Sequence, residues 1–286
     1  MTPTVYIVVG PTAVGKTKYA IELALALKTE IISADARQCY QELNIGVARP
    51  SSLELSKVPH HFIASHSIQD TVNAGVFEQY AFAKANELLT KFGAAVMVGG
   101  TGLYIKAFVE GMDQIPEIDP AIRIQIQQEV STKGIDWLQG QVKQLDPDYW
   151  AIADQGEQQN TQRLSRALEV MTGTGQSILS FQNQTKQTRP FNIQKIGLEM
   201  PRAQLYDRIN QRVHQMDQMG LEEEVKALHP QFHLNALQTV GYQEWLPYLE
   251  GKQSKEAVIQ AIQQNTRHYA KRQMTWFKKD PVIKWS

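Results

Sequence analysis

The residues with the clearest chemical meaning lie near the start of the chain and match the pattern G-x-x-x-x-G-K-[ST]. In this pattern the backbone N–H groups of a loop and the N-terminus of the following helix surround an anion. Lys16 adds a positive charge on the phosphates, and the hydroxyl of Thr17 can hold Mg²⁺. The pattern predicts a phosphate-binding loop (P-loop) without specifying ATP. Its residues are Gly10, Pro11, Thr12, Ala13, Val14, Gly15, Lys16 and Thr17.

Two further candidates follow predicted strands. Asp35 comes just after residues 30–33, and Thr101 follows residues 94–98 and a pair of glycines. Ligands of open α/β sheets bind beyond the carboxyl ends of the strands, so both side chains could face the P-loop. Each also has an ordinary structural interpretation, with Asp35 capping a turn and Thr101 capping a helix. No carboxylate ends the strand at 94–98, which weakens the interpretation as an ATPase, because P-loop NTPases usually place a Mg²⁺-binding Asp there.

The elements that must position these residues alternate between strand and helix. Short apolar runs predict strands at residues 5–9, 30–33 and 94–98, and helical spacing of apolar residues predicts helices over 16–27 and 76–92. Such alternation predicts an α/β fold with a parallel sheet and helices on both faces.

The pattern changes near Gly111. Residues 119–181 show helical periodicity and no clear strand, with Asp119 and Pro120 as the start of a helix. A polar loop is expected over 182–188. After it we predict a strand at 193–200, helices over 202–219 and 256–275, and an edge strand at 282–285. The expected organisation is a P-loop core formed by residues 1–112 and 189–286, interrupted by a helical insertion domain over 113–188 that contacts the substrate.

Composition limits where the chain can bind a polyanion. Lys+Arg and Asp+Glu both total 29, so any nucleic-acid binding must use local patches. The segment 252–286 is one, with eight Lys or Arg against two acidic residues. The sequence has one cysteine, no apolar run long enough for a membrane span and no signal-peptide pattern at its start. We therefore expect a cytoplasmic protein without a membrane partner. The adjacent His60 and His61 are interpreted as a loop or surface pair, not as a metal site.

Basic residues gather at two places with helical spacing. Arg163 and Arg166 share one face of a predicted helix, and residues 269–279 mix basic and aromatic side chains. Basic groups can follow phosphates while aromatic rings stack on bases. The alternatives are a solvated basic face for the arginines and a core position for the aromatic residues, which we favour for Trp276.

Short segments spread in order over nearly the whole chain form a recognisable set. They are GPTAVGKT (10–17), IISADARQCY (31–40), NIGVARP (44–50), PHH (59–61), VGGTGLY (98–104), QRLSRALE (162–169), VGY (240–242) and AKRQMTWF (270–277). The set resembles the bacterial tRNA dimethylallyltransferases. The P-loop is generic, whereas the segments at 31–40, 98–104 and 162–169 together are specific. Residues 47–49 and 158–162 differ from the family's usual pattern.

The resemblance implies a reaction and a set of roles. The P-loop would hold the diphosphate of dimethylallyl diphosphate with Mg²⁺ near Thr17, and Asp35 would accept a proton from the exocyclic amine of an adenosine in the anticodon stem-loop of tRNA. Thr101 would donate a hydrogen bond to the bridging oxygen of the leaving diphosphate. The target base must leave its stack to reach such a site. The protein is expected to be a monomer. The expected tRNA contacts are Asp35, Ala36, Arg37, Gln38, Thr101, Arg123, Gln159, Asn160, Thr161, Gln162, Arg163, Arg166, Lys271, Arg272, Lys278 and Lys279.

Two other functions fit parts of the sequence. A P-loop kinase for a small molecule or nucleotide would use Asp35 to bind a hydroxyl acceptor, but it needs an Arg-rich lid, and basic residues are sparse in the insertion before Arg163. A non-catalytic RNA-binding module would have no need for the intact set of Lys16, Thr17, Asp35 and Thr101.

Overall fold

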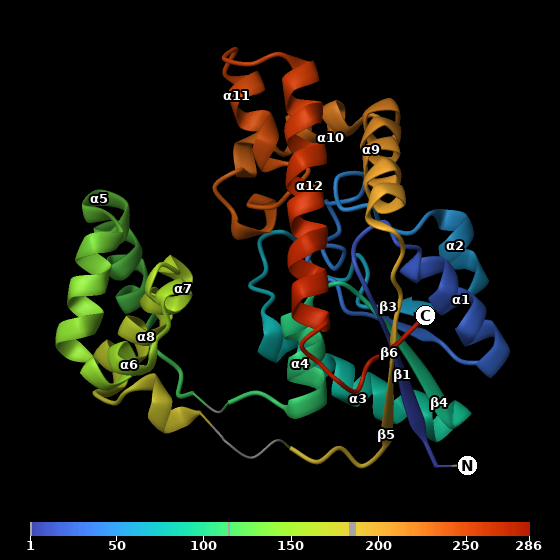
Figure 1. Cartoon of the computed structure of the whole chain (residues 1–286), viewed down its shortest axis with the longest axis horizontal. Coiled ribbons are helices and arrows are strands. Elements are labelled where there is room, and N and C mark those ends of the chain that lie inside the picture. Colours follow the sequence, from blue (N-terminus) through green and yellow to red (C-terminus); the bar gives the residue numbers. More distant parts are fainter. Residues whose placement is uncertain (1, 114, 183–186) are drawn as a thin grey trace. The chain divides into compact units, whose positions relative to one another are not determined.

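The computed structural model describes residues 2–113, 115–182 and 187–286, and it divides into two compact units (Figure 1). Unit 1 comprises Met1–Gly111 and Gln187–Ser286, and unit 2 comprises Met112–Lys186. No helix of the described residues is both long and apolar enough to cross a membrane.

Unit 1 is built on a six-stranded sheet in the order β3-β2-β4-β1-β5-β6, and every pair of neighbours is parallel. The central strand β1 pairs with β4 on one side and with β5 on the other, with Val5 opposite both Ala95 and Ile193. The predicted α/β class with a parallel sheet is confirmed. The strands are β1 (Thr4–Val9), β2 (Ile31–Ser33), β3 (His60–His61), β4 (Ala94–Val98), β5 (Asn192–Gly197) and β6 (Lys284–Trp285).

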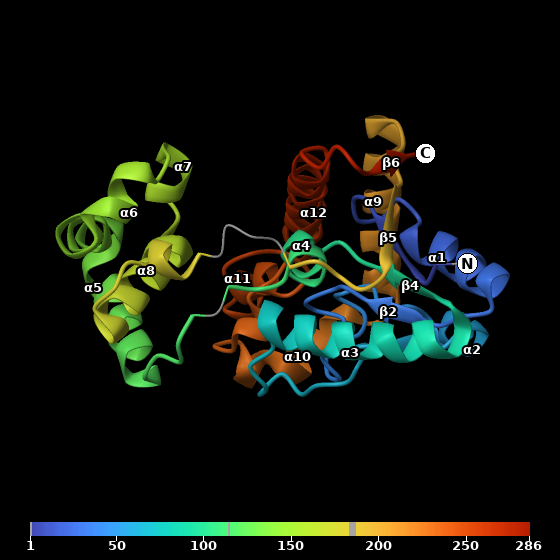
Figure 2. The same ribbon diagram turned by 90° about the horizontal axis from the view of Figure 1, so that it is seen from below.

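Helices cover both faces of this sheet, and the alternation of side chains along β1 shows how. Val5, Ile7 and Val9 belong to a core with α3 (Ala74–Phe92) and α4 (Gly102–Glu110). Val8 points to the other face and packs with Ala20, Ile21 and Ala24 of α1 (Lys16–Leu27). Figure 2 shows α3 running along the sheet. The strands are therefore buried on both sides, as their nearly continuous apolar runs predict.

Local signals set the ends of the long helices. Helix α1 has the predicted bounds, and α3 begins at Ala74, two residues before the predicted helix. Its N-cap is Asn73, whose side chain accepts from the N–H groups of Gly75 and Val76. Helix α3 ends at Gly93 in the left-handed conformation. A capping box formed by Ser51 and Glu54 starts α2 (Ser52–Lys57), a helix that the sequence analysis does not predict.

The second part of unit 1 is mostly helical after β5, which ends at Gly197 rather than at the predicted residue 200. Helices α9 and α12 match the predicted helices closely and pack against each other, whereas α10 and α11 are not predicted (Figure 1). Edge strand β6 lies within the predicted 282–285. The helices are α9 (Arg202–Gln218), α10 (Leu221–Leu228), α11 (Leu246–Leu249) and α12 (Lys255–Phe277), with 3₁₀ turns η2 (His229–Gln231), η3 (Asn235–Leu237) and η4 (Gln243–Trp245).

Unit 2 is helical in its described residues and has a core of its own, which includes Ile126, Leu138, Leu164 and Leu168. Asp119 caps its first helix through the N–H of Ala121, and Pro120 is the first helical residue, as predicted. Residues 183–186 of the predicted loop at 182–188 lie outside the described residues. The helices are α5 (Pro120–Leu145), α6 (Pro147–Ile152), α7 (Gln155–Gln158) and α8 (Thr161–Thr174), with 3₁₀ turn η1 (Ile178–Phe181).

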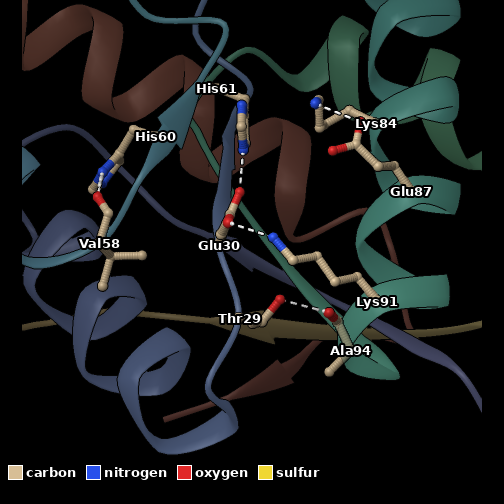
Figure 3. A network of polar contacts seen from close by, with 9 residues as sticks. All are labelled: Thr29, Glu30, Val58, His60, His61, Lys84, Glu87, Lys91 and Ala94. Carbon is tan, nitrogen blue, oxygen red and sulfur yellow. Dashed lines mark hydrogen bonds and ion pairs between the residues drawn. The ribbon is translucent and has the colours of Figure 1, made fainter.

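The histidine pair is not the loop that the sequence suggested, because His60 and His61 form edge strand β3 (Figure 3). The Nε2 atom of His61 lies 2.7 Å from a carboxylate oxygen of Glu30, whose other oxygen lies 3.9 Å from Lys91 Nζ on α3. This network ties β3 and α3 to the start of β2. Among the described residues, no group of three or more His, Cys, Asp or Glu could hold a metal ion.

Candidate active site

The P-loop connects the central strand β1 to α1, and its backbone has the conformation of an anion cradle. Gly10 and Gly15 have φ angles of 144° and 106°, and Ala13 between them has a φ of 67°. A Cβ on Gly10 would lie 2.5 Å from the Leu198 carbonyl oxygen, so glycine is required there. The apolar side chains of Ala13 and Val14 pack against α9 and α12. Helices α9 and α12 therefore support the P-loop through apolar contacts.

Lys16 lies in this loop with its Nζ donating to the carbonyl oxygen of Pro11 at 2.8 Å. Burial, together with the nearby positive charge of Arg212, lowers the pKa of Lys16 to about 7, and Asp35 opposes this shift. The ammonium group therefore lacks a full counter-charge in the protein. An anionic phosphate placed on the loop would supply it.

Gln273 of α12 joins the P-loop to the turn after β4. Its Oε1 accepts from the backbone N–H of Thr12 at 2.7 Å, and its Nε2 donates to the Gly100 carbonyl oxygen at 3.0 Å. Arg212 of α9 donates to the Thr12 hydroxyl at 3.2 Å. Burial, and then the charge of Arg208, lower the pKa of the Arg212 guanidinium. The sequence analysis missed Gln273, Arg208 and Arg212.

Asp35 stands where β2 ends and has two roles in the geometry. Its Oδ1 accepts from the backbone N–H groups of Arg37 and Gln38 at 2.9 and 3.2 Å, so it does cap a turn. It also lines the space in front of the P-loop. The two sequence interpretations of Asp35 are therefore compatible, because a carboxylate has lone pairs left after capping.

Thr101 is held beside this turn. Its hydroxyl oxygen accepts from the Ala36 N–H at 3.0 Å, and its own N–H donates to the Ala34 carbonyl oxygen at 3.3 Å. Thr101 occupies the N-cap position of α4, but its side chain makes no capping hydrogen bond. The helix-cap interpretation is therefore right for its position and wrong for its side chain. A Cβ on Gly99 would overlap the backbone of Ala34, which explains the glycine. The ends of β2 and β4 thus meet with Asp35 and Thr101 on adjoining segments.

Two cavities adjoin at Asp35. The larger, about 810 Å³, is lined by Lys16, Thr17, Lys18, Arg208 and other residues of the P-loop side. The smaller, about 390 Å³, is lined by Thr101 and by apolar side chains of three segments, among them Val47, Val240 and Ile262. Both are lined by Thr12, Asp35, Val47, Ala48, Arg212, Met216 and Tyr269. A carboxylate therefore stands between a basic cavity and a more apolar one.

The loop at residues 44–48 lines both cavities and is fixed from α10. Glu224 accepts from the N–H groups of Ile45 and Gly46 at 2.8 and 3.0 Å, and from the Tyr242 hydroxyl at 2.6 Å. A Cβ on Gly46 would lie 2.5 Å from the Tyr242 ring. Gln38 donates to the carbonyl oxygens of Val47 and Ala48. The side chain of Gln38, a predicted tRNA contact, thus holds this loop of the cavity wall through its amide nitrogen.

The other predicted RNA-contacting residues of unit 1 are divided between the cavity and the surface. Ala36, Arg37 and Arg272 line the smaller cavity with Asp35 and Thr101. Lys271 and Lys279 are exposed on and after α12. Lys278 pairs with Glu199 at 2.6 Å and lies 4.1 Å from the Trp285 ring centroid.

In unit 2 the predicted contact residues form a second basic group. Glu169, almost fully buried, accepts from both Arg123 and Arg166 at 2.9 and 2.8 Å. Arg163 pairs with Glu157. Gln159, Asn160, Thr161 and Gln162 lie at the start of α8, where Asn160 caps the helix through the N–H of Arg163.

The preferred interpretation of Trp276 as a core residue was wrong. Its side chain is 42% exposed, whereas the neighbouring Phe277 is 3% exposed and fills the core position. Adjacent residues of a helix point about 100° apart, so only one of the two could face inward.

The chain is similar to known proteins over most of its length. The sequence model described as IPP transferase matches residues 38–280. A tRNA dimethylallyltransferase of Christiangramia forsetii is 50% identical over 97% of this chain and 91% of that protein, and one of Cytophaga hutchinsonii is 43% identical over 98% and 91%.

Solved structures extend the comparison to the fold. The full-length tRNA isopentenylpyrophosphate transferase of Bacillus halodurans has a TM-score of 0.72 and 34% identity, with 99% of this chain and 89% of that one covered. A eukaryotic dimethylallyltransferase acting on tRNA shares the fold, with a TM-score of 0.81 at 23% identity over 99% and 73% of the two chains. The match over most of the chain, together with the P-loop, Asp35 and Thr101 at one site, shows that this chain belongs to the IPP transferase family.

Proposed function

We propose that this protein transfers the dimethylallyl group of dimethylallyl diphosphate to the exocyclic amine of an adenosine in tRNA, at the position 3′-adjacent to the anticodon, and releases diphosphate. The observation that carries this proposal is the position of Asp35 between the basic cavity of the P-loop and the smaller cavity lined by Thr101. A transferase needs such an arrangement, because the acceptor must attack the reacting carbon from the side opposite to the departing diphosphate.

The donor's diphosphate fits the basic cavity. The loop N–H groups, Lys16 and the guanidinium groups of Arg208 and Arg212 offer donors and positive charge to it. These groups stabilise the charge that grows on the diphosphate as its bond to carbon breaks. Thr101, whose hydroxyl hydrogen is free to turn because the oxygen only accepts from Ala36, can donate to the bridging oxygen.

The acceptor adenine fits the smaller cavity, where Asp35 meets its exocyclic amine. This amine is a poor nucleophile because its lone pair is delocalised into the ring. As the nitrogen–carbon bond forms and the carbon–oxygen bond of the donor breaks, one amine proton passes to the Asp35 carboxylate and the electron pair leaves with the diphosphate. General-base catalysis of this kind contributes about 10²–10⁴ in rate.

Mg²⁺ suits the larger cavity on chemical grounds. Mg²⁺ prefers hard oxygen ligands and usually binds through substrate phosphates with few protein groups, and Thr17 supplies a hydroxyl at the first turn of α1. When bound, the ion would neutralise charge on the diphosphate. The absence of a multi-carboxylate cluster among the described residues fits a metal that arrives with the substrate.

For the tRNA we propose two contact regions, one in each unit. Arg123, Arg163 and Arg166 of unit 2 and the exposed basic residues of α12 offer charge to the phosphates. We further propose that the protein works as a monomer, because the P-loop, Asp35 and Thr101 of one chain together complete the site, and that it works in the cytoplasm, because its one cysteine is free.

Radiolabel transfer tests the function against its alternatives. Label should pass from dimethylallyl diphosphate to bulk tRNA in the presence of Mg²⁺, and no label should pass from [γ-³²P]ATP to tRNA or to a small hydroxyl acceptor. Transfer from ATP would favour a kinase. Binding of tRNA without transfer from either donor would favour a non-catalytic RNA-binding module.

A further inference from the structure

The exposed indole of Trp276 lies in a groove on the outer side of α12. The groove has a volume of about 380 Å³ and is lined by His268, Lys271, Arg272, Thr275, Trp276 and Lys279. None of these lining residues is acidic, and three are permanently basic. The surface therefore combines an aromatic ring with positive charge, which is the combination that binds single-stranded nucleic acid.

The indole is fixed close to the reacting groups. A Cβ added to Gly102 would overlap the Trp276 ring, so the ring packs directly on the backbone at the start of α4. Gly102 follows Thr101, which lines the smaller cavity. A glycine at this place permits the approach, and a ring held by backbone loses little conformational freedom when a ligand stacks on it.

Arg272 connects the groove to the smaller cavity, because its side chain lines both. A base that enters this cavity remains joined to its neighbours through the phosphate backbone. The neighbouring nucleotide must therefore lie near the cavity mouth, and a basic path leads from there along α12.

Resting on the function proposed above, we propose that the groove of Trp276 binds the nucleotide next to the target adenosine, with its base stacked on the indole and its phosphates near Lys271 and Lys279. The flipping of the target base breaks stacking with its neighbours, and the indole restores one stacking partner. Trp276 is thus a binding residue that stabilises the opened loop, and not a catalytic one.

The test measures equilibrium binding of anticodon stem-loop RNA without donor. Trp276→Ala should weaken binding by roughly ten-fold or more, as loss of one base–aromatic stack does, whereas Trp276→Phe should stay within about three-fold of wild type. Leu25→Ala is the control, since Leu25 is 52% exposed on α1 and lines neither cavity nor groove.

Stem-loops with an abasic nucleotide on the 5′ or the 3′ side of the target adenosine separate stacking from structural damage. One of these two RNAs lacks the base that stacks on Trp276, and wild type and Trp276→Ala should bind that RNA with equal affinity. Equal binding of the intact RNA by wild type and Trp276→Ala would overturn the proposal, and so would an equal loss on intact and both abasic RNAs. The wild-type transfer assay is independent of these comparisons, so failure of the proposed function would be seen separately, as no transfer from dimethylallyl diphosphate.

Discussion

The side chain of Gln273 accepts a hydrogen bond from the backbone N–H of Thr12 at 2.7 Å, across 261 residues of sequence. Its amide nitrogen also donates to Gly100, so one residue of α12 fixes both the P-loop and the glycine turn after β4. The geometry of the phosphate site therefore depends on the last long helix as well as on the motif itself.

Gln273→Leu removes both hydrogen bonds with little change in volume. We expect the KM for dimethylallyl diphosphate to rise about ten-fold and the protein to lose about 1–3 kcal/mol of stability, because Thr12 N–H and Gly100 C=O lose their partners. Initial-rate kinetics and thermal melts measure the two effects. Gln264→Leu, at an exposed position of the same helix, is the control and should change neither.

Asp35→Asn separates the two roles of Asp35. The amide oxygen can still accept from Arg37 and Gln38, so the turn is retained, but the general base is lost. Turnover should fall by about 10²–10⁴ while tRNA affinity stays within a few-fold of wild type. Single-turnover transfer and tRNA binding give the two numbers. Turnover close to that of wild type would remove Asp35 from the mechanism.

Donor binding should depend on pH through Lys16. The pKa of Lys16 is about 7 in the free protein, and the diphosphate favours the charged ammonium, so binding takes up a proton above that pH. Affinity for dimethylallyl diphosphate should therefore fall as pH rises from about 7 to 9. Lys16→Arg, whose guanidinium stays charged, should show a flatter profile over the same range. Identical profiles for the two proteins would contradict this assignment, because the donor's own ionisation is common to both.

Glu224→Ala should loosen the loop at residues 44–48. The change leaves Ile45 N–H, Gly46 N–H and the Tyr242 hydroxyl without their acceptor, at a cost of about 2–4 kcal/mol. We expect a Tm lower by several degrees and higher KM values for both substrates, since the loop lines both cavities. Glu223→Ala, at the exposed neighbouring position of α10, should leave both unchanged.

The salt dependence of tRNA binding should distinguish Lys271 and Lys279, which have no ion pair within the described residues, from the paired Lys278. Lys271→Ala and Lys279→Ala should each reduce the magnitude of the slope of log K against log salt by about 0.7–0.9, the value for one phosphate contact. Lys278→Ala should leave the slope nearly unchanged, because Lys278 already pairs with Glu199. Titrations of tRNA affinity against KCl measure these slopes, and an effect of Lys278→Ala equal to the other two would mean that its pair with Glu199 opens on binding.

Much of the core was predictable because its signals are local. The short, β-branched apolar runs at 5–9 and 94–98 end at glycines, which favours buried strands, and α1 follows the P-loop with the predicted bounds. The closeness of Asp35 and Thr101 was predictable because the ends of parallel strands meet at one edge of a sheet. Strand β3 was missed because its two residues become a strand only by pairing with β2.

The missed site residues lie on helices whose tertiary position no local pattern gives. Arg212 and Gln273 are polar residues within amphipathic helices, and such residues are usually solvated. They face the P-loop only because α9 and α12 pack behind Ala13 and Val14. Trp276 was misjudged for the same reason, since helical spacing fixes the angle between Trp276 and Phe277 but not which of them faces the core.

The two points at which unit 2 joins unit 1 lie together, since the N–H of Gln187 donates to the carbonyl oxygen of Glu110 at 2.9 Å. A segment whose ends meet in this way interrupts no strand and no helix of its host. In evolutionary terms such a module can be gained, exchanged or enlarged in a single recombination event, while the host sheet keeps its register. The insertion can thus change in sequence or length while the sheet that carries the P-loop, Asp35 and Thr101 stays the same.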